Sequence, residues 1–144
     1  MAKNQLKDIL NQIKIDVREV VDNEVTDAIK DVYRDEVKFM YDEYKPFSYE
    51  RRYDDEGFGD ESKWKTESDL KGNTVYFELK NEAKAVNSTM RLDKIIEEGI
   101  YDTVVSPGER PVYERTSQRL ESDRVVENGL SMGLKARGYK MVKK

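Results

Sequence analysis

An acidic stretch near the middle of the chain contains the residue types that most readily bind a metal ion. It covers residues 54–61 (DDEGFGDE), and hard cations prefer clustered oxygen ligands of this kind. The spacing does not match an EF-hand, because Phe58 occupies the fifth position counted from Asp54 and Lys65 occupies the twelfth, where a bidentate Glu is required. We interpret the stretch as a solvated acidic loop and keep a metal-dependent hydrolase as a competing hypothesis.

The composition removes the commonest routes to catalysis. The 144-residue chain has no His and no Cys, so it lacks the bases, nucleophiles and soft metal ligands of most active sites. Its 30 acidic residues make carboxylate pairs common by chance, and no pair lies in an apolar segment that would shift its pKa. Gly57-x-Gly59 lacks the third Gly of a dinucleotide-binding motif. We identify no catalytic, cofactor-binding or metal-binding residue.

Residues 44–53 are rich in aromatic residues and arginine, the types enriched at the energetic centres of protein interfaces. If the segment is extended, the adjacent Arg51 and Arg52 point to opposite faces. One can then pair with a carboxylate inside the fold while the other faces a partner. The interface candidates in this segment are Tyr44, Pro46, Tyr49, Arg51, Arg52 and Tyr53.

A long helix over residues 1–45 is expected to carry this segment. Between Asn4, which fits an N-cap, and Tyr44, apolar residues recur at spacings of three and four, and Pro46 ends the pattern. A straight helix of this length would span about 60 Å, more than a domain of this size. Either the helix breaks near Asp22–Glu24, or one end projects and packs on a neighbouring subunit. Its apolar positions are Leu6, Ile9, Leu10, Ile13, Val17, Val20, Val21, Ala28, Ile29, Val32, Tyr33 and Met40.

An extended loop and a β-hairpin are expected within residues 46–90, with the hairpin at about 63–82. From Trp64 to Leu79 apolar and polar residues alternate around a turn at residues 71–73, so one face should be apolar. Two strands alone are marginal, and a third strand can come from 47–53 or from 84–88.

Short helices are expected within residues 91–138. Residues 92–99 read as a short helix closed by a Gly, Pro111 fits the first turn of the next helix, and Gly138 fits the end of the last one. Asn128-Gly129 is expected to mark a break in that last helix. Gly129-x-x-x-Gly133 matches a dimerisation motif of membrane helices, and we give it no weight in a polar chain.

The size and charge of the chain favour one α+β domain over residues 1–144 with a large partner-facing surface. Charged residues make up 39% of the chain and hydrophobic residues 37%, which indicates a thin core. The net charge of −4 argues against a simple nucleic-acid binder, although the tail 139–144, an edge strand or a mobile arm, is basic. We expect no membrane span and no signal peptide, and hence a cytosolic protein.

Four motifs together resemble one family of small structural proteins, the head–tail joining or tail-completion proteins of long-tailed phages and prophages of Gram-positive hosts. The first and most specific motif is YKPxxYERR, at residues 44–52. The others are LDxIIExG at residues 92–99, GxRP at residues 108–111 and LKxRG at residues 134–138. The chain departs from the family pattern after Phe58, where Gly59-Asp60 is more polar.

The resemblance implies an α+β fold in which a long N-terminal helix packs on a small antiparallel sheet. It implies a subunit without enzymatic activity that forms a homo-oligomeric ring, often a hexamer, between the neck or connector proteins and the tail tube or tail terminator. DNA would pass through the ring without specific binding, and the protein would reside in the host cytoplasm during assembly and then in the neck or tail of the virion. Arg110 and Arg137, which lie in the GxRP and LKxRG motifs, join the six interface candidates above. The competing hypothesis is a soluble binding or regulatory module that acts through its long helix.

Overall fold

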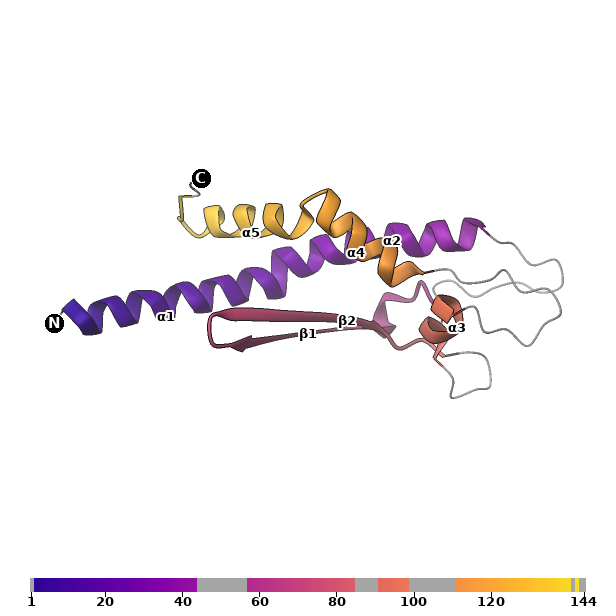
Figure 1. The fold of residues 1–144 in the computed structure, drawn as a ribbon, viewed down its shortest axis with the longest axis horizontal. Coiled ribbons are helices and arrows are strands. Elements are labelled where there is room, and N and C mark those ends of the chain that lie inside the picture. The colour runs from indigo at the N-terminus through magenta and orange to yellow at the C-terminus, as the bar shows by residue number, and fades with distance from the viewer. Residues whose placement is uncertain (1, 44–56, 85–90, 99–110, 141, 143–144) are drawn as a thin grey trace.

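One long helix runs along the molecule, with a β-hairpin on one side and two C-terminal helices on the other (Figure 1). The computed structural model describes residues 2–43, 57–84, 91–98, 111–140 and 142. The arrangement is the α+β fold that the sequence predicts, a long N-terminal helix, a small antiparallel sheet and short C-terminal helices. The interpretation of residues 1–144 as a single domain stays a prediction.

The long helix consists of α1 (Ala2–Val20), the π-helical turn η1 (Val21–Val25) and α2 (Thr26–Glu43). The helix does not break near Asp22–Glu24 but takes a π-helical turn there, and its N-terminal end projects beyond the other elements (Figure 1). Packing of the projecting end on a neighbouring subunit stays a prediction. The Thr26 hydroxyl donates to the Val21 carbonyl five residues earlier, at 2.6 Å, which helps to satisfy the wider turn. The helix begins at Ala2, so the N-cap predicted at Asn4 is wrong.

The hairpin pairs β1 (Trp64–Lys71) with β2 (Thr74–Asn81) in antiparallel register, Trp64 opposite Asn81. Gly72 has a φ of 61°, which a two-residue hairpin turn requires. Burial alternates along both strands, as predicted. Among the described residues the sheet has two strands, and Lys84 forms only an isolated bridge with Arg91. The other candidates for a third strand, 47–53 and 85–88, lie outside the described residues.

Three further helices follow: α3 (Leu92–Glu98), α4 (Val112–Ser122) and α5 (Val125–Ala136). Pro111 lies one residue before α4 rather than in its first turn. The break predicted at Asn128-Gly129 is wrong, because α5 continues through it and the chain turns instead at Arg124, whose φ is 53°. Gly138, with a φ of 92°, ends α5, and Tyr139 N–H donates back to the Leu134 carbonyl at 3.0 Å.

Two hydrophobic clusters hold these layers together. One gathers around Tyr33, Phe58 and Trp64, where α2, the hairpin and α3–α4 meet. The other forms around Val20 and Val25, and both the hairpin and the α4–α5 pair pack on it. The hairpin needs no third strand for its apolar face to be buried, because the long helix covers that face.

Candidate functional site

The N-terminal end of α1 carries an apolar stripe that the rest of the described chain leaves uncovered. Residues 3–12, which we call the arm, are all exposed. Leu6, Ile9 and Leu10 lie on one face of it with 59, 57 and 51% of their surface accessible. The stripe continues the face that carries Val20, which the hairpin and α5 cover farther along the helix. The uncovered stripe therefore has the apolar spacing of a helix face that is normally buried in a hydrophobic core, but no described residue covers it.

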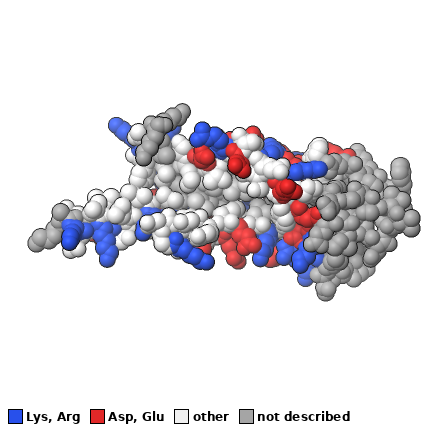
Figure 2. Space-filling model, viewed as in Figure 1, with Lys and Arg blue, Asp and Glu red and all other residues white. Residues whose placement is uncertain are grey.

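A line of lysines runs beside this stripe. Lys3, Lys7 and Lys14 are separated by four and seven residues, so they lie along one edge of the helix. Figure 2 shows basic side chains along one edge of the projecting end of α1, with uncharged side chains beside them. Asp8 is the only acidic residue between Lys3 and Lys14, so the amphipathic arm and the adjacent Lys14 together carry three positive charges and one negative charge.

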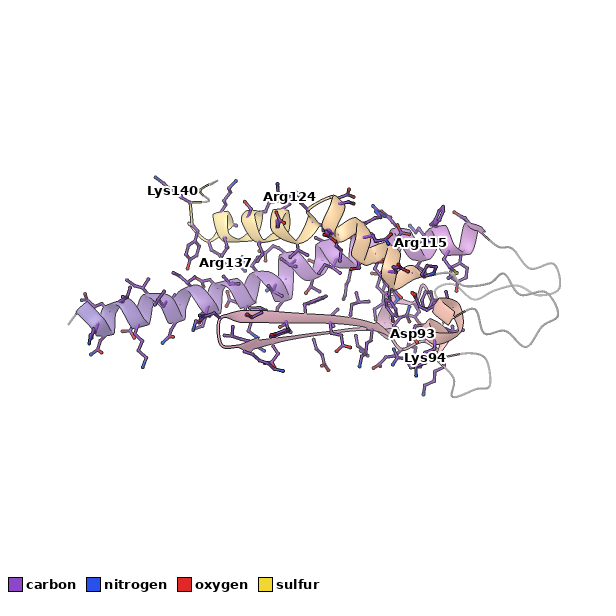
Figure 3. All side chains as sticks on the ribbon, in the orientation of Figure 1. Asp93, Lys94, Arg115, Arg124, Arg137 and Lys140 are labelled. Carbon is purple, nitrogen blue, oxygen red and sulfur yellow. The ribbon has the colours of Figure 1, made fainter. Side chains whose placement is uncertain are left out.

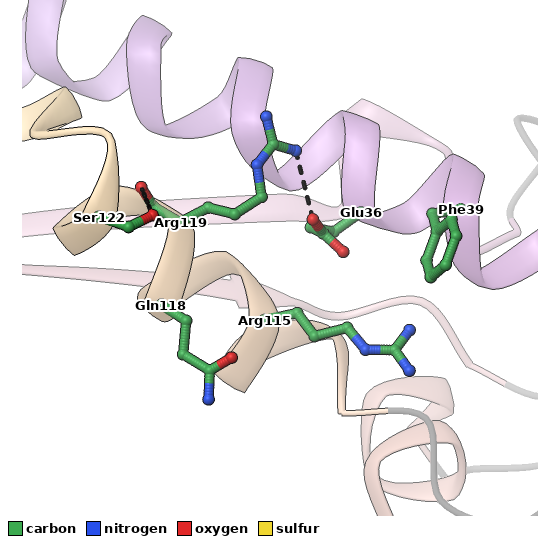
Figure 4. Close-up of a pocket in the computed structure, with 6 residues that line it drawn as sticks. All are labelled: Glu36, Phe39, Arg115, Gln118, Arg119 and Ser122. Atoms are coloured by element: carbon green, nitrogen blue, oxygen red, sulfur yellow. Dashed lines mark hydrogen bonds and ion pairs between the residues drawn. The ribbon is translucent and has the colours of Figure 1, made fainter.

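A groove of about 450 Å³ lies between α2 and α4, toward the other end of the long helix (Figure 4). Phe39, with 52% of its surface exposed, supplies an aromatic wall, and the Arg115 guanidinium lies 5.2 Å from the ring centre. Arg119 crosses the groove and pairs with Glu36 at 3.2 Å. The groove is lined by Glu36, Phe39, Arg115, Gln118, Arg119 and Ser122.

Two glycines let α5 approach the long helix closely. Gly129 and Gly133 are buried against Val25 and Val20. A Cβ at position 129 would lie 3.3 Å from Val25 Cγ2, and one at position 133 would overlap the Val20 side chain. The G-x-x-x-G spacing therefore has a structural role in this contact between helices of one chain, and the interpretation of the spacing as without meaning is wrong.

Polar contacts also stabilise the packing of α5 on the long helix. Arg137 is labelled in Figure 3, beside α5. Its Nη1 donates to Glu24 Oε1 at 2.8 Å and to the Gly133 carbonyl at 3.0 Å. The hydrogen bond from Arg137 holds the pKa of Glu24 below its ordinary value. The Tyr139 hydroxyl donates to Asp16 Oδ2 at 2.5 Å, next to the point where the uncovered arm begins. These contacts mark the point along α1 beyond which α5 and the residues after it no longer cover the helix.

A buried polar cluster at the base of the hairpin is the closest the described chain comes to an active-site constellation. Asn81 Nδ2 donates to the Tyr33 hydroxyl at 3.0 Å and to the Phe58 carbonyl at 2.7 Å. The Tyr113 hydroxyl accepts from Asn81 N–H and donates to Asp93, both at 2.8 Å. Burial raises the pKa of Tyr33 and of Tyr113, so both phenols stay protonated at neutral pH. The cluster joins the hairpin to α2, α3 and α4. This structural role accounts for its burial, and no catalytic role is needed to explain it.

A comparison with family models shows which protein family this chain belongs to. The model of the YomN family, a phage-derived family, matches residues 5–136. The chain belongs to the YomN family. No curated protein and no solved structure matches it. The relationship makes this a phage-related protein, in agreement with the phage or prophage origin that the sequence motifs imply.

Among the interface residues predicted for this YomN-family chain, the structure describes only Arg137, which binds Glu24 and lies 3.6 Å from Glu19 within the chain. The remaining candidates lie outside the described residues, namely Tyr44, Pro46, Tyr49, Arg51, Arg52, Tyr53 and Arg110. The arm was not among the predicted sites, although the sequence contains the regularly spaced lysines beside Leu6, Ile9 and Leu10.

The described part of the acidic stretch is engaged within the YomN-family fold. Asp60 caps the short helix η2 (Glu61–Lys63) by accepting from Ser62 N–H at 3.0 Å. Glu61 pairs with Arg34, whose hydrogen bond lowers the Glu61 pKa. Among the described residues no group of three carboxylates is placed to hold a metal ion, and no helix is long and apolar enough to cross a membrane.

Proposed function

We propose that this chain is a structural protein of the phage neck or tail, a tail-completion or head–tail joining subunit that forms a ring between the connector and the tail tube. The observation that carries the proposal is the arm, a core-type helix face that projects uncovered from a chain of a phage-derived family. Such a face is expected to be buried in the functional state, because contiguous exposed apolar surface marks an interaction site.

Composition and shape support the same role. A chain with 39% charged residues and a thin core gains stability by burying additional apolar surface between subunits. Repeated contacts between unlike surfaces close into a ring when the rotation between subunits closes. The resemblance implies a ring that is often six-fold, with DNA passing through the lumen without specific binding. The net charge of −4 suits a lumen that does not hold DNA tightly.

Purified particles of the parent phage provide the test. Quantitative mass spectrometry should find the chain in the particles at a fixed low copy number, and gold-labelled antibodies against it should mark the head–tail junction. A phage that lacks the gene should produce heads and tails that fail to join. Abundant chain in the lysate with none in the particles would refute the proposal.

The same arm also favours a second candidate, a binding or regulatory module. An amphipathic helix that lays its apolar face in a partner's groove is a common recognition mode. In that case the chain would be monomeric, would be absent from particles and would co-purify with one host protein through the arm. Particle composition separates the two functions.

A further inference from the structure

The arm cannot reach the α2–α4 groove of its own chain. Leu6 and Phe39 lie 33 residues apart on one long helix, a separation of about 50 Å at the rise of a helix. Each copy therefore exposes the arm and the groove at distant points of the long helix, whose two ends lie far apart in Figure 1.

The groove and the carboxylates beside it carry a small excess of negative charge where the arm carries positive charge. Three carboxylates surround the guanidinium of Arg119, from Glu36 at 3.2 Å, Asp35 at 3.7 Å and Asp123 at 4.0 Å. With the second guanidinium of the groove, that of Arg115, the three negative and two positive charges leave a net charge of −1. Asp35 and Asp123 are more than half exposed, so an approaching cation can reach them. This excess is complementary to the lysine line of the arm.

The apolar surfaces are complementary as well. Phe39 is half exposed in the groove, and the guanidinium of Arg115 lies over its ring as a cation–π contact. The groove volume of about 450 Å³ corresponds to about 15 water molecules, which can be displaced by side chains of a docked helix. Leu6, Ile9 and Leu10 form the matching apolar edge next to the lysines.

We propose that the arm of one copy docks in the α2–α4 groove of the next copy, so that copies associate head to tail. The inference rests on the proposed function, which makes the chain an assembling subunit, and it names the surfaces that meet. Leu6, Ile9 and Leu10 pack on Phe39, and the lysines face Asp35 and Asp123. Because the two surfaces differ, the contact is heterologous and leaves a free arm and a free groove until a ring closes.

Cross-linking tests the pairing directly, because the chain has no native Cys. Copies with Ile9→Cys and copies with Phe39→Cys are purified separately, mixed and treated with a short bis-maleimide. Cross-linked dimers are expected in the mixture and not from either variant alone. Tyr76→Cys, at an exposed position on the hairpin, is the matched control and should not link to Ile9→Cys. Efficient linking of Ile9→Cys to itself would overturn the inference by showing that arms pair with arms.

Assembly of charged variants gives a second, independent readout. Ile9→Asp and Phe39→Asp should each weaken self-association by about tenfold or more. Mixed together they should form dimers, since the intact groove of one receives the intact arm of the other. Both positions are more than half exposed in the single chain, so urea unfolding curves should match that of the unmodified protein.

The outcomes separate this inference from the proposed function. Unmodified protein that stays monomeric at every concentration, or Phe39→Asp protein that assembles as well as the unmodified chain, overturns the docking contact. Arm-dependent binding to anionic vesicles or to DNA that Phe39→Asp leaves unchanged, without assembly, does the same. None of these results affects the particle composition, which decides the proposed function by itself.

Discussion

Position 133 faces Val20 at the contact between α5 and the long helix. A methyl group there would overlap the Val20 side chain, whereas at position 129 it would only come within 3.3 Å of Val25. In both places Ala would otherwise be favoured over Gly inside a helix by about 1 kcal/mol. The close approach of the helices, rather than backbone freedom, accounts for the glycine at position 133.

Gly133→Ala is therefore expected to lower the free energy of unfolding by about 1 kcal/mol, because an overpacking cost of about 1–3 kcal/mol exceeds the gain in helix propensity. Gly129→Ala is the matched control and should be neutral or slightly stabilising. Urea unfolding of both variants measures the difference. If the two substitutions had equal effects, the described packing would be wrong.

Acid should weaken the pair of Arg137 and Glu24. The pKa of Glu24 lies below its ordinary 4.5 in the folded protein because Arg137 donates to it. The unfolded chain then binds the proton more readily, so the stabilisation is complete above pH 4.5 and is lost as the pH falls through the lower folded pKa. Arg137→Gln should flatten the acid side of a stability–pH curve measured by urea unfolding between about pH 3 and pH 7.

Arg124→Gln serves as the control for that curve. Arg124 pairs with Glu127 three residues away, but both side chains are largely exposed, and exposed pairs contribute little. Its curve should follow that of the unmodified protein. An Arg137→Gln variant with an unchanged acid slope would show that the contact with Glu24 does not persist in solution.

At the scale of elements, the π-helical turn η1 sets how the two halves of the long helix are rotated. The extra residue in this turn keeps Val20 facing Gly133 while Tyr33 faces the hairpin base. One residue corresponds to a rotation of about 100° around a helix. The turn therefore aligns two cores that a regular helix would place on different faces.

Deleting Asn23, an exposed residue of η1, should convert the turn to a regular helix and rotate α1 relative to α2. Val20 would leave its place against Gly133, so α5 should lose protection in amide hydrogen exchange while the hairpin base keeps it. Asn23→Ala preserves the length and is expected to leave exchange in α5 nearly unchanged. Equal protection of α5 in the deletion variant would contradict this role.

The sequence predicted the elements well because their signals are local. Apolar periodicity located the long helix, and alternation located the hairpin and its turn. The length of the helix pointed to a break near Asp22–Glu24, where the structure has a π-helical turn. The sequence pattern misplaced the break in the last helix at Asn128-Gly129, because the glycine signals a close helix contact and not a turn. That contact depends on Val25, which is distant in sequence, so no local pattern contained it.

The candidate site was less accessible to sequence reasoning. The arm, with Leu6 and Ile9, had the periodicity of a buried face, and only the three-dimensional structure shows that this face is left without cover. The groove between α2 and α4 joins Phe39 to Arg115, residues that no pattern connects. Conversely, the predicted segment 44–53 lies outside the described residues, so its role stays a prediction.

At the scale of the whole molecule, we expect segment 44–53 and the arm to make separate contributions to assembly. Replacing both Arg51 and Arg52 with Ala should weaken assembly more than folding, because these side chains are predicted to face partners. Light scattering reports the loss of oligomer, and urea unfolding reports the fold. Intact rings from the double variant would count against this part of the interface.

The central claim is that copies of this chain complete one another through the arm, and the mass of the unmodified protein in solution tests it most directly. Light scattering over a concentration series should show a discrete oligomer, or monomers that convert to it as concentration rises, and Ile9→Asp should remain monomeric. A strict monomer at every concentration, with a mass unaffected by Ile9→Asp, would contradict the claim.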